Sequence, residues 1–367
     1  MFEMRNYEYL KSLVAENEIP CDWVTLSVVH AYMSQESFDH ALDQYHGCHT
    51  TYTNLDELVK VVVPGATDPS LEDLRISKAK GAFVQKHAAS VWPYKLVSWM
   101  LEQILASSKA FNLQTNTPVT RVQKTGSGSW IVHTNRGMIA AKKVLLTTNA
   151  YTSYLLPEFS DLIVPVRGEM SSLTSPRTMK PGSENQPLVY SYGFMGHGTQ
   201  GGHQDDYLIQ RPYISGTIGG ELMFGGGRSY AKNEGVGVSD DSSIDPPAAQ
   251  YLRQEINVVL DTKSDEKELA ATFEWSGIMG FSRDTRPWVG AVSEDLGLGG
   301  GEGLWICAGF TGHGMPNTCL SAKAAVDMML GKDKGGVDLP STYHISKERL
   351  EKARVLKTVK EADLDGL

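Results

Sequence analysis

The sequence has little cysteine, an excess of acidic over basic side chains and no long apolar run. Its 367 residues include only four cysteines, which lack the paired spacing of a disulfide or zinc framework: Cys21, Cys48, Cys307 and Cys319. The formal charge of −9 argues against a general attraction to nucleic acid or to anionic membranes. No apolar run reaches the roughly 18 residues of a membrane helix. We therefore expect a reduced, cytoplasmic protein that acts on a small molecule and contacts neither nucleic acid nor membrane.

The signature motifs of several enzyme classes are missing as well. There is no G-x-S-x-G, H-E-x-x-H or G-x-x-x-x-G-K-[ST], so neither the common hydrolases nor the P-loop proteins are indicated. The segment His46-Gly47-Cys48-His49 offers soft ligands, but no second ligand cluster accompanies it, and we predict no metal site. The single literal G-x-G-x-x-G, Gly196–Gly201, is followed by two aspartates and a strand-like run. A pyrophosphate site needs a helix there, so we interpret this segment as a glycine loop.

The distribution of apolar residues predicts a mixed α/β protein of roughly two domains. The first forty residues have a helical pattern, in which Phe2, Leu10 and Val14 share one face. Residues 93–110 form the clearest helix, because apolar side chains recur on one side and a proline occupies the first turn. Further helices are expected at 34–45, 248–261 and 318–330, and strands at 117–123, 130–134, 138–146, 303–310 and, between turns, across 163–281.

Two strands run into segments that suit contact with a ligand. The first ends in Thr147, Thr148 and Asn149, small polar residues after an apolar strand. The second leads into Gly309–Met315, where three glycines let the backbone approach a flat or anionic ligand and the following helix offers free N–H groups. Both patterns also fit plain structure, the first as an ordinary strand end and the second as a tight strand-to-helix turn in which His313 bonds only to backbone.

The segment GFTGHGMPNT resembles the flavin-contacting loop near the C-terminus of the D-amino-acid-oxidase-like FAD-dependent oxidoreductases. That family includes glycine oxidase, sarcosine oxidase and gamma-glutamylputrescine oxidase. Other segments resemble the family in the same order along the chain: TPV at 117–119, VLLTTNAYTSYLLPEF, PVRGEM, YLIQRP, ELMFGGGR and GIMGFSRDTRPWVGAV. The resemblance extends over residues 80–332.

The resemblance implies an α/β fold of the glutathione-reductase-like FAD/NAD(P)-binding type, interleaved with a substrate domain built on a mixed sheet. The substrate domain would comprise 1–80 as its helical part and 163–280 as its sheet. The FAD-binding domain would comprise 81–162 and 281–335, and a charged tail would follow at 336–367. The implied activity is hydride transfer to FAD from the C–H next to nitrogen in an amine or a similar small molecule.

The resemblance also assigns residues to the site. The catalytic candidates are His313, in the loop, and Arg283, where the family brings the substrate sheet back against the flavin. The expected cofactor contacts are Val119, Thr147, Thr148, Asn149, Gly309, Phe310, Thr311, Gly312, Gly314 and Met315. Four further arginines are better explained by ion pairs: Arg167, Arg211, Arg228 and Arg286. Five aromatic residues could wall a pocket, although their alternating positions are more typical of a core: Tyr192, Phe194, Tyr213, Phe224 and Trp275.

One departure from the family concerns the dinucleotide. The family begins with a strand, a G-x-G-x-x-G turn and an acidic residue that binds ribose, and this sequence begins downstream of all three. We therefore expect an incomplete dinucleotide-binding fold, in a truncated chain or in a family member that no longer binds FAD in the usual way. Because the pyrophosphate lacks its glycine turn, we expect weak FAD binding or none.

The positions that contact substrate differ as well. Pro316 matches the place of the lysine that grips the substrate carboxylate in sarcosine oxidase, and Met223 matches the lysine that promotes its reaction with oxygen. No cysteine lies near Met279 to link a flavin covalently. An amine, another alkyl-nitrogen compound or a carbinol is therefore favoured over a sarcosine-type amino acid. The alternative is a cofactor-free protein of the same fold that serves as a binding protein, an isomerase or a cyclase.

Overall fold

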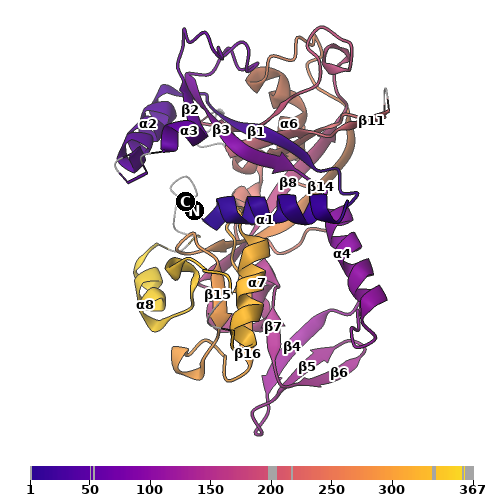
Figure 1. The fold of residues 1–367 in the computed structure, drawn as a ribbon, viewed down its shortest axis with the longest axis vertical. Helices are drawn as coiled ribbons and strands as arrows, with labels where there is room; N and C mark the ends of the chain where they lie inside the picture. Colours follow the sequence, from indigo (N-terminus) through magenta and orange to yellow (C-terminus); the bar gives the residue numbers. More distant parts are fainter. Residues whose placement is uncertain are drawn as a thin grey trace.

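Two sheet-based halves form the protein, one above the other in Figure 1. The computed structural model describes residues 2–49, 51–52, 54–196, 205–215, 218–332, 336–357 and 359. The upper half is built on an eight-stranded mixed sheet with the strand order β14-β8-β13-β10-β9-β1-β3-β2. These strands are β1 (Val24–Tyr32), β2 (Val59–Val62), β3 (Gly81–Ser90), β8 (Ile163–Leu173), β9 (Tyr190–Met195), β10 (Asp205–Gln210), β13 (Leu222–Gly226) and β14 (Ala271–Ser282).

The two faces of this sheet are covered differently. Helix α6 (Pro246–Val259) packs against one face, where its Leu252 joins Phe194 and Phe224 in the largest core. On the opposite face, α2 (Gln35–His49) covers only the β1–β3 end, through Phe38 against Phe83. The short helix α3 (Leu55–Leu58) precedes β2, and a small hairpin of β11 (Tyr213–Ser215) and β12 (Ile218–Gly219) follows β10. The middle of the opposite face is therefore left for other contacts.

The lower half contains two smaller sheets. A three-stranded sheet has the order β15-β16-β7, from β7 (Val144–Leu146), β15 (Trp288–Ala291) and β16 (Leu304–Ala308). A second sheet is an antiparallel meander of β4 (Val119–Lys124), β5 (Trp130–Thr134) and β6 (Gly137–Ala141). The helices of this half are α5 (Thr152–Leu155), α7 (Thr318–Met329) and α8 (Lys347–Val355).

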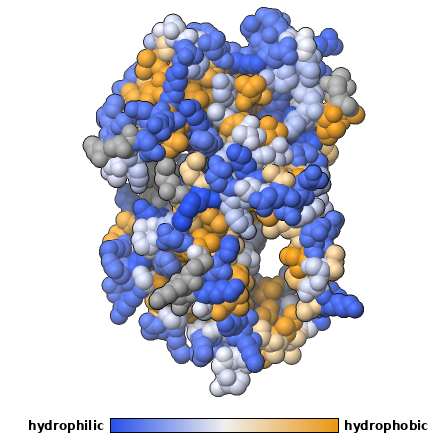
Figure 2. All heavy atoms as spheres, in the orientation of Figure 1, coloured by the Kyte–Doolittle hydropathy of each residue, from blue (hydrophilic) through white to orange (hydrophobic). Residues whose placement is uncertain are grey.

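Long elements connect the halves. Strands β8 and β14 pair antiparallel over their whole length, so that Ile163 lies in the lower core and Leu173 in the upper one. Helix α1 (Phe2–Glu16) crosses between the halves, and α4 (Pro93–Ser107) descends from the upper sheet toward the meander (Figure 1). Figure 2 shows an opening through the molecule at this junction, between α7 and α4. The junction is thus held at its edges and hollow inside.

Several predicted elements are confirmed, and two are wrong. The strand expected at 138–146 is two strands, β6 and β7, in different sheets. The helices expected at 93–110, 248–261 and 318–330 correspond to α4, α6 and α7. The helical pattern of the first forty residues ends at Glu16, and β1 follows. The run VTLSVVHAY is rich in β-branched residues, and alternation buries its Val29 and Ala31 while the side chains between them face the other way. The region 1–80 is therefore mixed and contains two strands of the large sheet.

Among the described residues, no helix is long and apolar enough to cross a membrane.

Candidate functional site

A cavity of about 690 Å³, here called the junction cavity, lies between the large sheet and the segment Gly309–Met315, here called the loop. The open face of the sheet supplies side chains from β8, β10, β13 and β14, and the loop supplies Thr311, Gly312 and His313. The remaining lining residues are Gly168, Glu169, Met170, Asp205, Tyr207, Gly226, Arg228, Trp275, Gly277, Ile278, Met279, Phe281 and Thr285. Three of the predicted site residues therefore line one cavity.

The first end of the loop is fixed by partly buried hydrogen bonds. The Asn149 Oδ1 atom accepts from the backbone N–H groups of Gly309 at 2.9 Å and Phe310 at 3.2 Å. The Thr311 N–H donates to the Gly280 carbonyl at 2.8 Å, and the Ser282 N–H donates to Thr311 Oγ1 at 3.0 Å. The two segments that the sequence marks as ligand-facing strand ends therefore meet directly, although 160 residues separate them.

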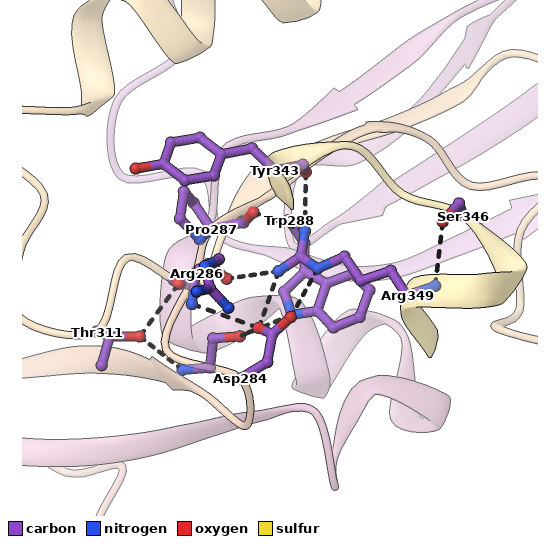
Figure 3. Close-up of polar contacts among 10 residues, drawn as sticks. Asp284, Arg286, Pro287, Trp288, Thr311, Tyr343, Ser346 and Arg349 are labelled. Atoms are coloured by element: carbon purple, nitrogen blue, oxygen red, sulfur yellow. Dashed lines mark hydrogen bonds and ion pairs between the residues drawn. The ribbon is translucent and has the colours of Figure 1, made fainter. Parts of the chain in front are cut away.

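A buried ion pair lies next to this end (Figure 3). The Arg349 guanidinium donates to both carboxylate oxygens of Asp284, at 2.8 and 2.9 Å, and stacks on Trp288 with 3.7 Å to the ring centroid. Burial acts to raise the pKa of the Asp284 carboxyl, but the hydrogen bonds and charge of Arg349 outweigh it and hold that pKa below its usual value. Because Asp284 also accepts from Ser282 Oγ at 2.8 Å, the pair fixes the segment that contacts Thr311.

The second end of the loop is held by α1. The Glu3 carboxylate lies 3.1 Å from His313 Nε2 and accepts from Asn317 Nδ2 at 3.1 Å. The hydrogen bond between them raises the pKa of His313 and lowers that of Glu3. Buried Asn6 accepts from the Leu320 N–H at 3.0 Å and donates to the Met315 carbonyl at 3.3 Å. Asn6 therefore caps the first turn of α7, in addition to joining α1 to the loop.

Between these two ends the loop has unused donors. Within the described residues, the backbone N–H groups of Gly312, Gly314 and Met315 have no hydrogen-bond acceptor. Gly312 has a φ of +68°, a conformation that glycine adopts without strain, and its side faces Met279 and Phe281 in the cavity wall. Free N–H groups next to a helix N-terminus stabilise negative charge on a bound group.

Arg228, whose side chain is 13% exposed, lines the junction cavity. Arg228 donates to Asp205 Oδ1 at 3.0 Å and stands 5.8 Å from the Phe281 ring centroid. Its other terminal nitrogen, Nη1, is buried and has no hydrogen-bond partner among the described residues. Burial raises the pKa of the Asp205 carboxyl despite the neighbouring guanidinium. The ion pair with Asp205 agrees with the interpretation of Arg228 from the sequence. The free donor, Arg228 Nη1, is visible only in the structure.

Glu169 has a strongly shifted pKa but serves the other face of the sheet. Burial raises the pKa of Glu169 to about 7. Although Glu169 is among the lining residues, side chains alternate along β8, so the side chains of Glu169 and of its neighbour Met170 point to opposite faces of the sheet. Glu169 instead accepts from the Asp245 N–H at 3.1 Å and lies 3.2 Å from Arg167 Nε, at the start of α6. We therefore do not treat its carboxylate as a proton acceptor for the junction cavity.

A second cavity, of about 750 Å³, lies where β4 and β7 meet the junction. Val119 and Thr148 both line it, which brings together two more of the predicted cofactor contacts. Ile278 lines both this cavity and the junction cavity, so the two are neighbours. Thr147 is exposed and is not among the lining residues of either.

The other predicted residues lie elsewhere. Arg283 donates to the backbone carbonyls of Leu356 and Arg354 and to Asp161, and it lines neither cavity, so its contacts tether the segment after α8. Phe310 is buried in the core under α7, and Met315 is 54% exposed. Tyr192, Phe194 and Phe224 are core residues, whereas Trp275 lines the junction cavity.

Two sequence segments have no place in these cavities. His46–His49 lies on α2, where His49 contacts Asp56 at 2.8 Å. Within the described ranges, no three His, Cys, Asp or Glu side chains are grouped to hold a metal ion. The segment Gly196–Gly201 falls outside the described residues apart from Gly196.

Solved structures of similar fold include oxidases and a dehydrogenase by name. Glycine oxidase from Geobacillus kaustophilus is 18% identical, with a TM-score of 0.68 over 94% of this chain and 81% of that one. L-proline dehydrogenase from P. horikoshii is 15% identical, with a TM-score of 0.68 over 96% and 83%. Iminodiacetate oxidase from Chelativorans sp. BNC1 is 13% identical, with a TM-score of 0.65 over 93% and 82%. These likenesses establish the fold: an FAD-binding part combined with a substrate domain.

The family model for FAD dependent oxidoreductases, DAO, matches residues 2–328. The chain therefore belongs to this family, and the resemblance drawn from the loop is confirmed. No curated protein matches the chain.

FAD, the cofactor of this family, suits the loop side of the junction cavity. The unpaired N–H groups of Gly312, Gly314 and Met315 are the kind of donor that the electron-rich edge of a flavin ring requires. Gly312 leaves the space next to them free of a side chain. The residues described thus fit the flavin ring, whereas the literal glycine motif contributes no described pyrophosphate site.

Proposed function

We propose that the chain is an FAD-dependent oxidoreductase that oxidises a carbon–nitrogen bond in an amine or a similar small molecule. The observation that carries the proposal is the loop: Gly312, whose N–H group is unpaired among the described residues, lines a cavity floored by the large sheet, and the unpaired N–H groups of Gly314 and Met315 follow it along the chain. Bound there, FAD would supply the hydride acceptor for oxidation of the substrate carbon next to nitrogen. Val119 and Thr148, in the neighbouring cavity, are the proposed contacts for the other part of the dinucleotide.

The chain's own residues have three tasks in this proposal. The loop N–H groups stabilise negative charge at the edge of the cofactor, and His313, whose pKa the hydrogen bond with Glu3 raises, lies beside them. Met170 and Trp275 cover the sheet side of the cavity and limit the access of water to the substrate. Arg228 Nη1 is a free donor for a hydrogen-bond acceptor on the substrate. No general base is required if the amine binds in its neutral form.

The proposal is tested by anaerobic flavin reduction. Purified chain is mixed with excess FAD under nitrogen, and a panel of primary amines, secondary amines and alcohols is added while the visible flavin absorbance is followed. We expect one or more amines to bleach the flavin band, and free FAD with the same amines to remain oxidised. His313→Ala should slow the bleaching more than it raises the amine concentration needed for half the maximal rate.

The panel also separates the proposal from the cofactor-free alternative. Protein-bound FAD that no amine reduces would contradict the oxidation of a carbon–nitrogen bond. A chain that binds amines but leaves the FAD spectrum unchanged would instead support a cofactor-free binding protein of this fold.

A further inference from the structure

A third cavity, of about 700 Å³ and here called the outer chamber, adjoins the junction cavity. It lies over the same open face of the sheet and reaches the start of α4 at Trp92 and Pro93. Met170 and Trp275 line both cavities, so these two side chains form the boundary between them. The outer chamber contains none of the residues that the sequence assigned to the cofactor or to catalysis.

The walls of the outer chamber are apolar and largely exposed. Met223, Ile209 and Phe273 line it together with Trp92 and Trp275. The side chains of Phe273, Trp275 and Trp92 are 74%, 43% and 38% exposed. Several large apolar groups exposed around one concave space mark a surface that gains free energy when an apolar group covers it.

The charges of the outer chamber are already neutralised within the chain. Arg211 pairs with Glu221 at 3.0 Å, Asp22 pairs with Lys95 at 2.8 Å, and Glu274 pairs with Arg253. At the mouth of the chamber, the centroid of the Trp92 ring lies 4.5 Å from the Arg211 guanidinium and 4.5 Å from the Lys95 ammonium. Both cations that contact this ring therefore belong to the protein and not to a ligand. The polar floor is also satisfied, because Ser172 and Thr272 bond to each other at 2.8 Å. A charged ligand group therefore finds no unpaired partner here.

We infer that the outer chamber holds an uncharged apolar or aromatic arm of the substrate, while the reacting carbon–nitrogen group lies in the junction cavity. The shared boundary at Met170 and Trp275 places the two parts of one molecule side by side. The inference rests on the proposed function and gives it a substrate class: amines that bear a bulky apolar substituent, in preference to methyl-sized ones.

The test measures binding by calorimetry on the chain without added FAD, so that it does not depend on turnover. Phenylbutylamine is the probe with an arm, and ethylamine is the probe without one. We expect phenylbutylamine to bind at least tenfold more tightly than ethylamine. Met223→Trp fills the chamber and should weaken phenylbutylamine binding at least tenfold. Met138→Trp makes the same change at a residue of β6 that is 70% exposed and outside the cavities, and should leave that binding unchanged.

A second variant covers the case in which Met223→Trp does not fold. Phe273→Ala removes a wall whose ring is 74% exposed, so it costs little stability, and it should weaken phenylbutylamine binding severalfold. Equal affinity for both amines, or unchanged affinity in both chamber variants, would overturn the inference. The flavin-reduction panel reports separately on the proposed function. An arm-dependent affinity without flavin reduction would retain the chamber as a binding site and reject the oxidation.

Discussion

The two ends of the loop are held in different ways. At the first end, Asn149 and Ser282 contact the loop through partly buried hydrogen bonds, and the neighbouring Asp284–Arg349 pair has both side chains about nine-tenths buried. At the second end, Glu3 and His313 form a pair whose side chains are 49% and 65% exposed. Buried pairs are costly to break, whereas exposed pairs contribute little. The difference indicates that contacts at the first end determine the position of the loop and that contacts at the second end contribute less to it.

The largest effect is expected at Arg349. Arg349→Met retains the apolar contact with Trp288 but leaves the Asp284 carboxylate buried without its partner. The expected loss in the free energy of unfolding is about 3–5 kcal/mol, measured by urea unfolding at neutral pH. Arg5→Met removes a guanidinium that faces exposed Asp338 and is the control, with a loss below about 1 kcal/mol. Equal losses of unfolding free energy in the two variants would show that the buried pair contributes no more than an exposed one. The first end of the loop would then not be held more firmly than the second.

Asn149 comes next. Asn149→Ala leaves the N–H groups of Gly309 and Phe310 without an acceptor and places alanine at a φ of +44°. We expect a loss of about 2 kcal/mol in the free energy of unfolding. Asn149→Asp keeps an oxygen at the same place and should recover most of that loss. If the aspartate variant were as unstable as the alanine variant, the two hydrogen bonds would not be the reason for the position of the loop.

Asn6 is the buried part of the second end, and its effect should be smaller. Asn6→Ala removes the acceptor for the Leu320 N–H in the first turn of α7. The expected loss is about 1–2 kcal/mol, the usual cost of a lost cap. Asn17→Ala, whose exposed amide bonds only within its own helix end, is the matched control and should cost less than half as much. A larger loss at Asn17 would contradict the assignment of Asn6 as the cap.

The smallest effect is expected at Glu3, and it depends on pH. The contribution of Glu3 is present above its ordinary pKa and is lost as the pH falls through its lowered folded-state pKa. The contribution of His313 is present below its ordinary pKa and is lost as the pH rises through its raised folded-state pKa. Glu3→Gln should therefore cost less than about 1 kcal/mol, and only between these limits.

Proton NMR titration of the His313 ring measures this pair directly. The pKa of His313 should fall in Glu3→Gln, because the group that raises it is gone. Glu348→Gln breaks an exposed pair with Lys352 on α8 and should leave the His313 titration as it is. A His313 pKa that is the same with and without the Glu3 carboxylate would show that the pair does not form in solution.

The part of the fold that was predictable from sequence is the part with strong local periodicity. Helices α4 and α6 were predictable because each has a proline in its first turn and apolar residues on one side. Strand β1 was missed because its short apolar run follows a true helix, although the alternation of buried Val29 and Ala31 with His30 was a readable signal. Strand β3 has no such alternation, since its first three residues are all buried.

The site also contains residues that were recognisable from the sequence and contacts that only the structure shows. The loop and the strand end at Thr148–Asn149 were recognisable because their glycine and small polar residues are local features. The contacts of Glu3 with His313 and of Asn6 with Leu320 join residues more than 300 positions apart, so only the folded chain shows them. The free donor on Arg228 depends on which side of β13 and β10 its neighbours face, which follows from strand pairing and not from spacing.

An FAD titration shows whether the loop forms one wall of a flavin site, as we propose. Gly312→Val and Gly297→Val both place valine at a φ above +60° where the chain leaves room for its Cβ, so both carry similar backbone strain. Only Gly312 lines the junction cavity. We expect weak but saturable quenching of flavin fluorescence by the wild-type chain, at least tenfold weaker binding in Gly312→Val, and wild-type binding in Gly297→Val. No quenching by the wild-type chain, or equal affinity in all three proteins, would contradict the proposal.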